Sequence, residues 1–226
     1  MQIKARRKDG AHGGNHLNYG NNIMNPKISF TATFAATLAG ALIALPAAAQ
    51  QKGDFTIGIG AHVVDPKSGN GNLAGAGSDI GSSTRPTITG EYFIRDNLGI
   101  EVLAALPFKH SVAVGGTHIG TVKQLPPVVS LQYHFANASA FTPFVGVGVN
   151  FTTFFSESTP LGDLKLKNSW GLAAHVGVDW AMNDKSALRI DARWADIDSR
   201  ATLNGAYIGT ANIDPTVYGV AYVYKF

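Results

Sequence analysis

The sequence contains no cysteine and few charged residues. Charged side chains make up 15% of its 226 residues, compared with roughly 25% in an average soluble domain. The absence of cysteine excludes disulfide bonds, zinc–thiolate sites and a thiol nucleophile. A hydrophobic content of 45% with a formal net charge of only +3 excludes a disordered chain. Glycine, in contrast, is abundant, with 26 residues.

The small excess of positive charge lies near the N-terminus. Five of the 18 basic residues precede position 50, against a single acid, Asp9. The other 13 basic and 14 acidic residues give residues 50–226 a net charge of −1. Because this part of the chain has no basic excess, we expect no nucleic-acid partner.

Residues 24–49 have the pattern of a secretory signal peptide. Lys27 precedes an uncharged, largely apolar run at 28–45, and three alanines ending at Ala49 provide a small-residue cleavage pattern. The alternative is a single transmembrane helix, since about 18 apolar residues can span a bilayer. The alanine- and threonine-rich run and the cleavage pattern favour the signal peptide. We therefore expect a mis-assigned start over 1–23, a signal peptide over 24–49 cleaved near Ala49, and a mature chain over 50–226.

The mature chain repeats a period of two, which is typical of β-strands. Eight segments alternate apolar with polar or small residues, and we expect strands of roughly 9–13 residues, which is the length that a tilted strand needs to cross a bilayer. The segments are 55–64, 87–94, 98–106, 128–135, 144–151, 169–180, 188–194 and 218–226.

Short and long connections between these segments alternate strictly. The short ones are 95–97, 136–141 and 181–185, and the long ones are 65–86, 107–127, 156–167 and 196–215. This order is typical of an up-and-down membrane barrel with short periplasmic turns and long extracellular loops. Both termini then lie on the periplasmic side.

A soluble sandwich or a lipocalin-like barrel is the alternative, with its apolar face turned inward. Two features favour the membrane barrel. The polar face carries many glycines, which suits the narrow lumen of eight strands, and the apolar face carries aromatics toward its ends. The last strand also finishes on Tyr222, Tyr224 and Phe226, which share one face. A strand in lipid needs a neighbour to close against. We therefore predict an all-β, eight-stranded antiparallel transmembrane barrel in outer-membrane lipid, whose C-terminal strand serves as an insertion signal for the barrel-assembly machinery.

Several segments, in this order, resemble the OmpW family of small outer-membrane barrels over 53–226. They are Asp96–Glu101, Leu125–Pro127, Gln132–Phe135, Pro143–Phe151, Ser169–Gly171, Gly177–Asp179, Asp196–Asp198, Asp214–Pro215 and Tyr224–Phe226. The resemblance implies a narrow, mostly apolar lumen that admits small hydrophobic molecules, or a narrow ion-conducting pore. It also implies a route in which the solute leaves sideways through the wall. Some members of the family are bacteriocin receptors or surface antigens.

Alternation places several candidate channel-lining residues in the lumen. Leu103 either forms a constriction or simply fills the barrel core. Arg189, Asp191 and Arg193 point inward, where a membrane barrel cannot leave charges unpaired. Two further inward acids, Glu101 and Asp179, are candidate partners. The charges then form either a polar plug or the lining of a conduit. Some family members carry an aromatic residue where this chain has Arg193. The resemblance therefore implies that the lumen of this chain is more polar than theirs.

Three inward histidines, His62, His134 and His175, raise the question of a metal site. They lie on strands that are not adjacent, so we expect polar lumen lining and no metal. No Ser/His/Asp set has a spacing that suggests catalysis, so we expect neither an enzyme nor a cofactor.

The long connection 107–127 carries apolar residues, namely Phe108, Val112, Val114 and Ile119. It forms either an extracellular mouth that gathers hydrophobic solutes or a hairpin that prolongs two strands. We therefore expect an outer-membrane barrel for passive entry of small, mainly hydrophobic molecules. The alternative is a structural or receptor protein with a plugged lumen.

Overall fold

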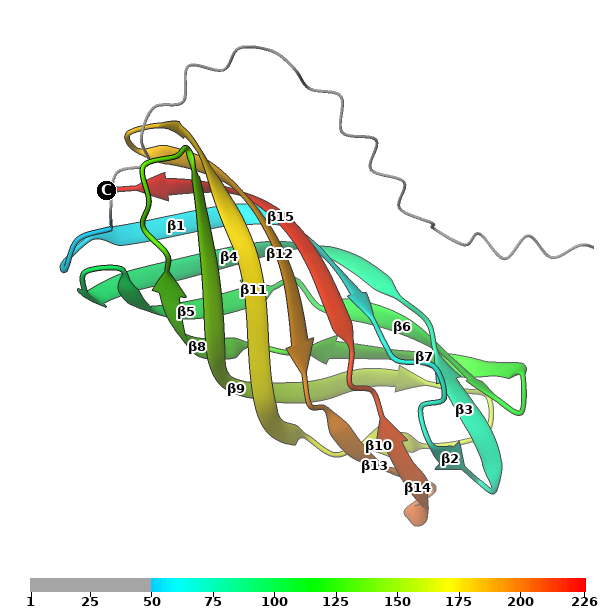
Figure 1. Cartoon of the computed structure of the whole chain (residues 1–226). Helices are drawn as coiled ribbons and strands as arrows, with labels where there is room; N and C mark the ends of the chain where they lie inside the picture. The colour runs from blue at the N-terminus through cyan, green and yellow to red at the C-terminus, as the bar shows by residue number, and fades with distance from the viewer. Residues whose placement is uncertain (1–49) are drawn as a thin grey trace, which may run out of the picture. The chain divides into compact units, whose positions relative to one another are not determined.

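The computed structural model describes residues 50–226, and all of the described secondary structure is β (Figure 1). The segments expected over 1–23 and 24–49, with the cleavage site near Ala49, lie outside the described residues. Within 50–226, no helix has the length and apolarity needed to cross a bilayer. The strands are β1 Phe55–Asp65, β2 Asn72–Leu73, β3 Ala76–Ile80, β4 Ser83–Arg95, β5 Leu98–Ala105, β6 Phe108–Val114, β7 Thr117–Leu125, β8 Val128–His134, β9 Phe141–Ser158, β10 Leu164–Leu166, β11 Ser169–Asn183, β12 Ser186–Ala195, β13 Asp198–Leu203, β14 Ala206–Asn212 and β15 Thr216–Lys225.

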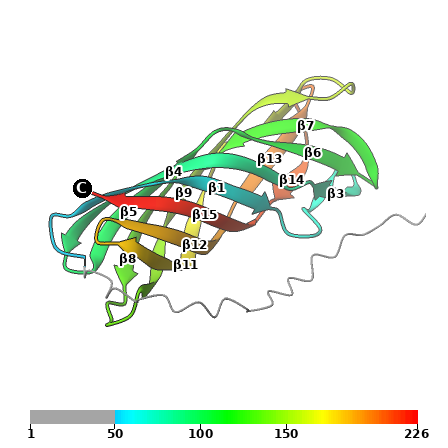
Figure 2. The same cartoon turned by 90° about the horizontal axis from the view of Figure 1, so that it is seen from above.

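Eight of these strands close into an antiparallel barrel. Their order around the barrel is β1, β4, β5, β8, β9, β11, β12 and β15, and β15 pairs back onto β1 (Figures 1 and 2). Thr56 near the start of β1 lies opposite Lys225 at the end of β15. The eight predicted strands and their antiparallel order are confirmed, and closure removes the open edges that lipid does not tolerate.

The two faces of the barrel wall differ as the alternation predicts. Large apolar side chains point outward, and Ile59, Val147 and Trp170 are 65%, 65% and 73% exposed. Of the exposed large apolar side chains in residues 50–226, all but Leu161 and Tyr207 lie on the barrel strands or directly beside them. The apolar outer band therefore ends where the barrel strands end, as is typical of the lipid-facing surface of a membrane barrel.

The four long connections are not simple loops, and this corrects the expectation from the sequence. They carry β2, β3, β6, β7, β10, β13 and β14, and β9 continues seven residues beyond its expected end, to Ser158. The hairpins β6–β7 and β13–β14 pair with β3 and β10, and β7 pairs with the far part of β9. We call these strands the extension. They continue the barrel wall. Their pairing provides hydrogen-bond partners for backbone N–H and C=O groups that are removed from water.

The join between the first and last strands is packed too tightly for a side chain at Gly60. A Cβ atom there would meet the Val220 carbonyl oxygen and lie 2.6 Å from the Cβ of Ala221. We expect Gly60→Ala to lower the free energy of unfolding by about 1–3 kcal/mol, because overpacking forces the strands apart. Urea unfolding and heat-modifiable gel mobility measure this. Gly90→Ala is the matched control, since its nearest neighbour is the Phe55 ring at 3.7 Å, and an equal loss in both variants would contradict the prediction.

Candidate functional site: the barrel interior

Six charged side chains meet inside the barrel, and we call them the ion-pair layer. Each is at most 6% exposed. They are Glu91 on β4, Glu101 on β5, Asp179 on β11, and Arg189, Asp191 and Arg193 on β12. The alternation of β12 points three consecutive inward positions at the lumen, as predicted. The neighbouring β11 supplies Asp179, and β4 and β5, which do not pair with β12, supply Glu91 and Glu101.

Arg189 is held by three carboxylates. Its Nε and Nη2 donate to the two oxygens of Asp179 at 2.7 and 2.8 Å, which is a bidentate pair. Its Nη1 donates to Glu101 at 2.8 Å, and Glu91 lies 3.6 Å from Nη2. The guanidinium also lies 4.4 Å from the centre of the Phe144 ring, a cation–π distance. These contacts therefore hold the guanidinium of Arg189 in one position.

Arg193 completes the layer on the side nearer the extension. It donates to Asp191 through Nε at 2.7 Å and to Glu101 through Nη1 at 2.6 Å. Asp191 in turn lies 3.0 Å from Nε2 of His62, whose Nδ1 is 2.7 Å from Thr87. Glu101 thus bridges the two arginines, and the chain of contacts reaches across to β1.

The other two inward histidines belong to the same network. His134 Nε2 lies 3.0 Å from Glu91, and the Gln132 amide nitrogen donates to Glu91 at 2.8 Å. His175 Nε2 lies 2.6 Å from the Gln132 amide oxygen. His134 and His175 thus share Gln132 as a partner, whereas His62 contacts Asp191. Among residues 50–226, the three rings do not lie close enough together to form one ligand set.

Two glycines make room for these rings. A Cβ at Gly219 would meet the ring of His62, and a Cβ at Gly146 would meet the ring of His175. Each glycine lies opposite the histidine on the neighbouring strand, where the missing side chain leaves space in a narrow eight-stranded lumen. The abundance of glycine on the polar face follows from this.

The ion-pair layer separates two small cavities. One of about 50 Å³ lies at the short-turn end and is lined by Glu91, Asp179 and Arg189. The other, of about 40 Å³, lies on the side of the extension and includes His62 and Arg193 in its lining. Of the two arrangements left open by the sequence, a paired plug or a conduit, the residues form the paired one.

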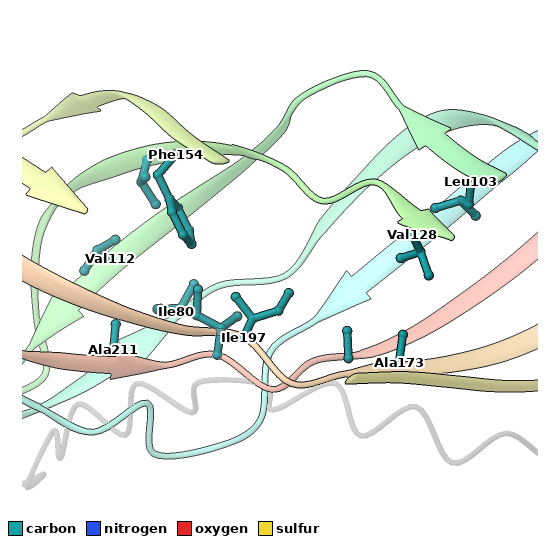
Figure 3. Close-up of a cluster of buried hydrophobic side chains, with 11 residues drawn as sticks. Ile80, Leu103, Val112, Val128, Phe154, Ala173, Ile197 and Ala211 are labelled. Carbon is teal, nitrogen blue, oxygen red and sulfur yellow. The ribbon is translucent and has the colours of Figure 1, made fainter. Parts of the chain in front are cut away.

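An apolar column continues from this second cavity into the extension. Leu103, which is 6% exposed, packs with Val128 and Ala173 at one end of the column (Figure 3). Toward the other end lie Ile80, Val112, Phe154, Ile197 and Ala211 (Figure 3). The lumen is therefore polar in one part and apolar in the other.

The wall beside the inner cavity also has a hollow on its outer face. This hollow is shallow and open to the surroundings, and it is lined by Ala174, Val176, Ala192 and Trp194, and also by the inward residues His175 and Arg193. Ala174, His175, Arg193 and Trp194 line the inner cavity as well. Near this point β15 begins after Pro215, which has no N–H to donate to the neighbouring strand. Like the rest of the barrel, the wall here is one strand layer thick, and it includes the small side chains of Ala174 and Ala192.

The residues expected at an extracellular mouth lie in the hairpin β6–β7. Phe108 is 2% exposed and lines the inner cavity, and Val112 is part of the apolar column. Val114 and Ile119 are partly buried. Residues 107–127 thus contain a hairpin, as one of the two alternatives expected, and Phe108 and Val112 are buried in its interior-facing side. Tyr222, Tyr224 and Phe226 point outward from the end of the chain, as the alternation predicts.

Three acids, Asp196, Asp198 and Asp214, cluster where the barrel meets the extension. In the part of the chain that the structure describes, they are the group whose oxygens lie close enough to share an ion. Lys67 lies 2.6 Å from Asp214 and supplies a positive charge to the cluster. Partial burial and the charges of Asp198 and Asp214 raise the pKa of Asp196.

Comparison with known proteins now identifies the family. The OmpW family model matches residues 51–226. The chain belongs to the OmpW family. Outer membrane protein W of Vibrio cholerae serotype O1 is 38% identical over 205 residues, covering 82% of this chain and 94% of that relative. A more distant relative, the dibenzothiophene metabolism operon protein PahQ of Pseudomonas aeruginosa, is 25% identical over 160 residues, covering 66% of this chain and 74% of that protein.

A solved structure supports the same assignment. The crystal structure of the outer membrane protein OprG from Pseudomonas aeruginosa matches with a TM-score of 0.69 and 34% identity, covering 78% of this chain and 97% of that one. This OmpW-family chain is therefore an outer-membrane β-barrel. In such barrels the short turns generally face the periplasm and the long connections face outward.

Sequence reasoning missed some residues of the site. Glu91, Gln132 and Gln124 are buried and line the interior, yet none was singled out. Alternation alone places Glu91 and Gln132 inward. Gln124 lies in a segment expected to be a loop, where no such signal is available.

Proposed function

We propose that this OmpW-family barrel admits small, mainly hydrophobic molecules passively, from the outside into the outer membrane. The observation that carries the proposal is the pair of hollows that share one stretch of wall, an inner cavity and an outer one, with Ala174 and Trp194 lining both. A solute would enter through the apolar column and leave sideways into lipid. The ion-pair layer argues against a straight route to the periplasm, because moving it would leave charges unpaired.

The chemistry of the column supports an apolar solute. Removing apolar surface from water stabilises a bound molecule by about 25 cal/mol per Å², and the column offers aliphatic and aromatic side chains such as Leu103 and Phe154. The name of PahQ links that relative to an operon for dibenzothiophene, an apolar aromatic compound.

The alternative is a structural or receptor protein whose lumen stays plugged. The dense pairing of Arg189 and Arg193 favours it, since a filled lumen needs no solute. Uptake of a fluorescent apolar probe by liposomes that contain the purified barrel separates the two functions. The proposal expects uptake above that of empty liposomes, and the alternative expects none.

We expect Ala174→Trp to reduce this uptake about fivefold or more, since an indole in the outer hollow would cover the wall there. Ala174 is an exposed residue in that hollow. Leu172→Trp is the matched control, because Leu172 lies on the same outer face of β11, is 67% exposed and lies outside the hollow. Equal uptake by the two variants would rule out exit at this place.

A further inference from the structure

Among residues 50–226, the inner cavity has one polar side-chain atom without a hydrogen-bond partner, the amide oxygen of Gln124 on β7. Gln124 is 1% exposed and lines the cavity together with Leu103, Phe108 and Val128. Its amide oxygen is buried and has no hydrogen-bond partner among residues 50–226. A buried acceptor in mainly apolar surroundings is costly unless something donates to it.

The orientation of this amide is fixed by a chain of hydrogen bonds from β6. His110 Nδ1 lies 2.6 Å from the Gly81 carbonyl oxygen, which can only accept, so Nδ1 carries the proton and donates. His110 Nε2 is then an acceptor. The Gln124 amide nitrogen lies 3.0 Å from it and must be the donor. The amide oxygen is therefore turned away from His110, and it belongs to a side chain that lines the cavity.

The neutral state of His110 preserves this arrangement. Its ring is 1% exposed and lies in the extension, beyond the eight barrel strands. Burial, together with the positive charge of Arg85, lowers the pKa of His110 despite the opposing effect of the bond to Gly81. The ring therefore stays an acceptor at neutral pH, and Gln124 keeps its oxygen free.

Other polar side chains of the cavity are already engaged. Asn150 donates to the Pro127 carbonyl at 3.2 Å and accepts from Thr152 at 2.7 Å. His62 contacts Thr87 and Asp191, and Arg193 is held within the ion-pair layer. The cavity thus offers an incoming molecule apolar contacts and the one free acceptor of Gln124.

We propose that this cavity binds small apolar molecules that carry a single hydroxyl group, with the Gln124 amide oxygen accepting the hydroxyl hydrogen bond. The inference deepens the proposed function and rests on it, since it names the class of solute that the apolar route selects. A volume of about 40 Å³ holds about three water-sized groups. It therefore fits a hydroxyl and the first carbons of a short alcohol.

The test compares 1-propanol with 1-fluoropropane, which have nearly the same shape but differ in the ability to donate a hydrogen bond. Binding to the purified full-length barrel in nanodiscs is measured by NMR, from the methyl shifts of Leu103 and Val128, which line the cavity and are unchanged in every variant. We expect 1-propanol to bind about tenfold more tightly, which corresponds to about 1.4 kcal/mol.

Two variants isolate the acceptor. His110→Phe keeps the Gln124 oxygen and retains a ring beside Phe108, so the preference for 1-propanol should persist. His110→Phe combined with Gln124→Met removes both candidate acceptors, and the two affinities should become equal while that for 1-fluoropropane stays the same. The single and the double variant differ from each other only at position 124. If the double variant does not fold, by heat-modifiable gel mobility, the comparison of the two solutes on the wild-type barrel and on His110→Phe still decides.

The outcomes separate this inference from the proposed function. Equal binding of both solutes to the wild-type barrel, as expected if a water molecule occupies the acceptor, overturns the hydroxyl preference but leaves an apolar route intact. A preference that survives in the double variant also overturns it. Failure of both solutes to bind overturns the proposed function itself.

Discussion

Leu103→Asp is expected to reduce uptake of a small apolar solute at least about tenfold. Leu103 is buried where the inner cavity meets the apolar column. A carboxylate at this place binds water, and displacing that water or burying the charge costs several kcal/mol. Each 1.4 kcal/mol lowers the affinity for the solute tenfold. Liposome uptake with wild-type and variant barrels measures the change, and planar-bilayer conductance is recorded in parallel.

Leu103→Met is the matched control, because it preserves volume and apolar character and is expected to leave uptake within about twofold of the wild type. Both barrels are first checked for folding by heat-modifiable gel mobility. If Leu103→Asp changes neither uptake nor conductance, the lumen is a plug and the proposed passage is wrong.

Arg189→Met is expected to cause the largest loss of stability, about 3–5 kcal/mol. The substitution leaves Asp179 without its bidentate partner and removes one of the two arginines that neutralise Glu101. Methionine fills much of the same space, so the loss reports mainly on the uncompensated carboxylates. Urea unfolding in lipid vesicles, followed by tryptophan fluorescence, measures the free energy of unfolding.

The control for this experiment is Lys185→Met. Lys185 is exposed in the short turn between β11 and β12, and removing a surface charge typically changes stability by less than about 0.5 kcal/mol. A loss below about 1 kcal/mol for Arg189→Met would show that the ion-pair layer contributes little to holding the barrel closed.

Alternation in the sequence was sufficient to predict the barrel and the direction of its side chains. The period of two in β12 put Arg189, Asp191 and Arg193 in the lumen, and the structure has them there. The partners were harder to predict, because contacts across a lumen depend on the stagger of strands around the whole barrel. His62 and Asp191 meet across 129 positions of the chain, a distance at which a local pattern carries no information.

Only the hairpin over 107–127, one of two alternatives, was expected of the extension, and the rest was not predicted for a different physical reason. Its strands are short, and the hairpin β6–β7 is interrupted by irregular pairing between Val112 and Ala113 and by glycines at its turn. These breaks hide the alternation of Phe108, His110 and Val112, which is otherwise the same signal that revealed the barrel strands. Without a visible alternation in this segment, the sequence does not place Gln124 in the interior.

The pairing of Thr56 with Lys225 joins the first strand of the barrel to the last. A chain made from its N-terminus cannot close until its final residues are available, so β1 waits for β15 while all the other strands are completed. Contacts between residues this distant in sequence are slow to form, and an unpaired strand edge is prone to join other chains. The topology therefore determines the order of assembly. The last strand, β15, converts an open sheet with an unpaired edge into a closed barrel.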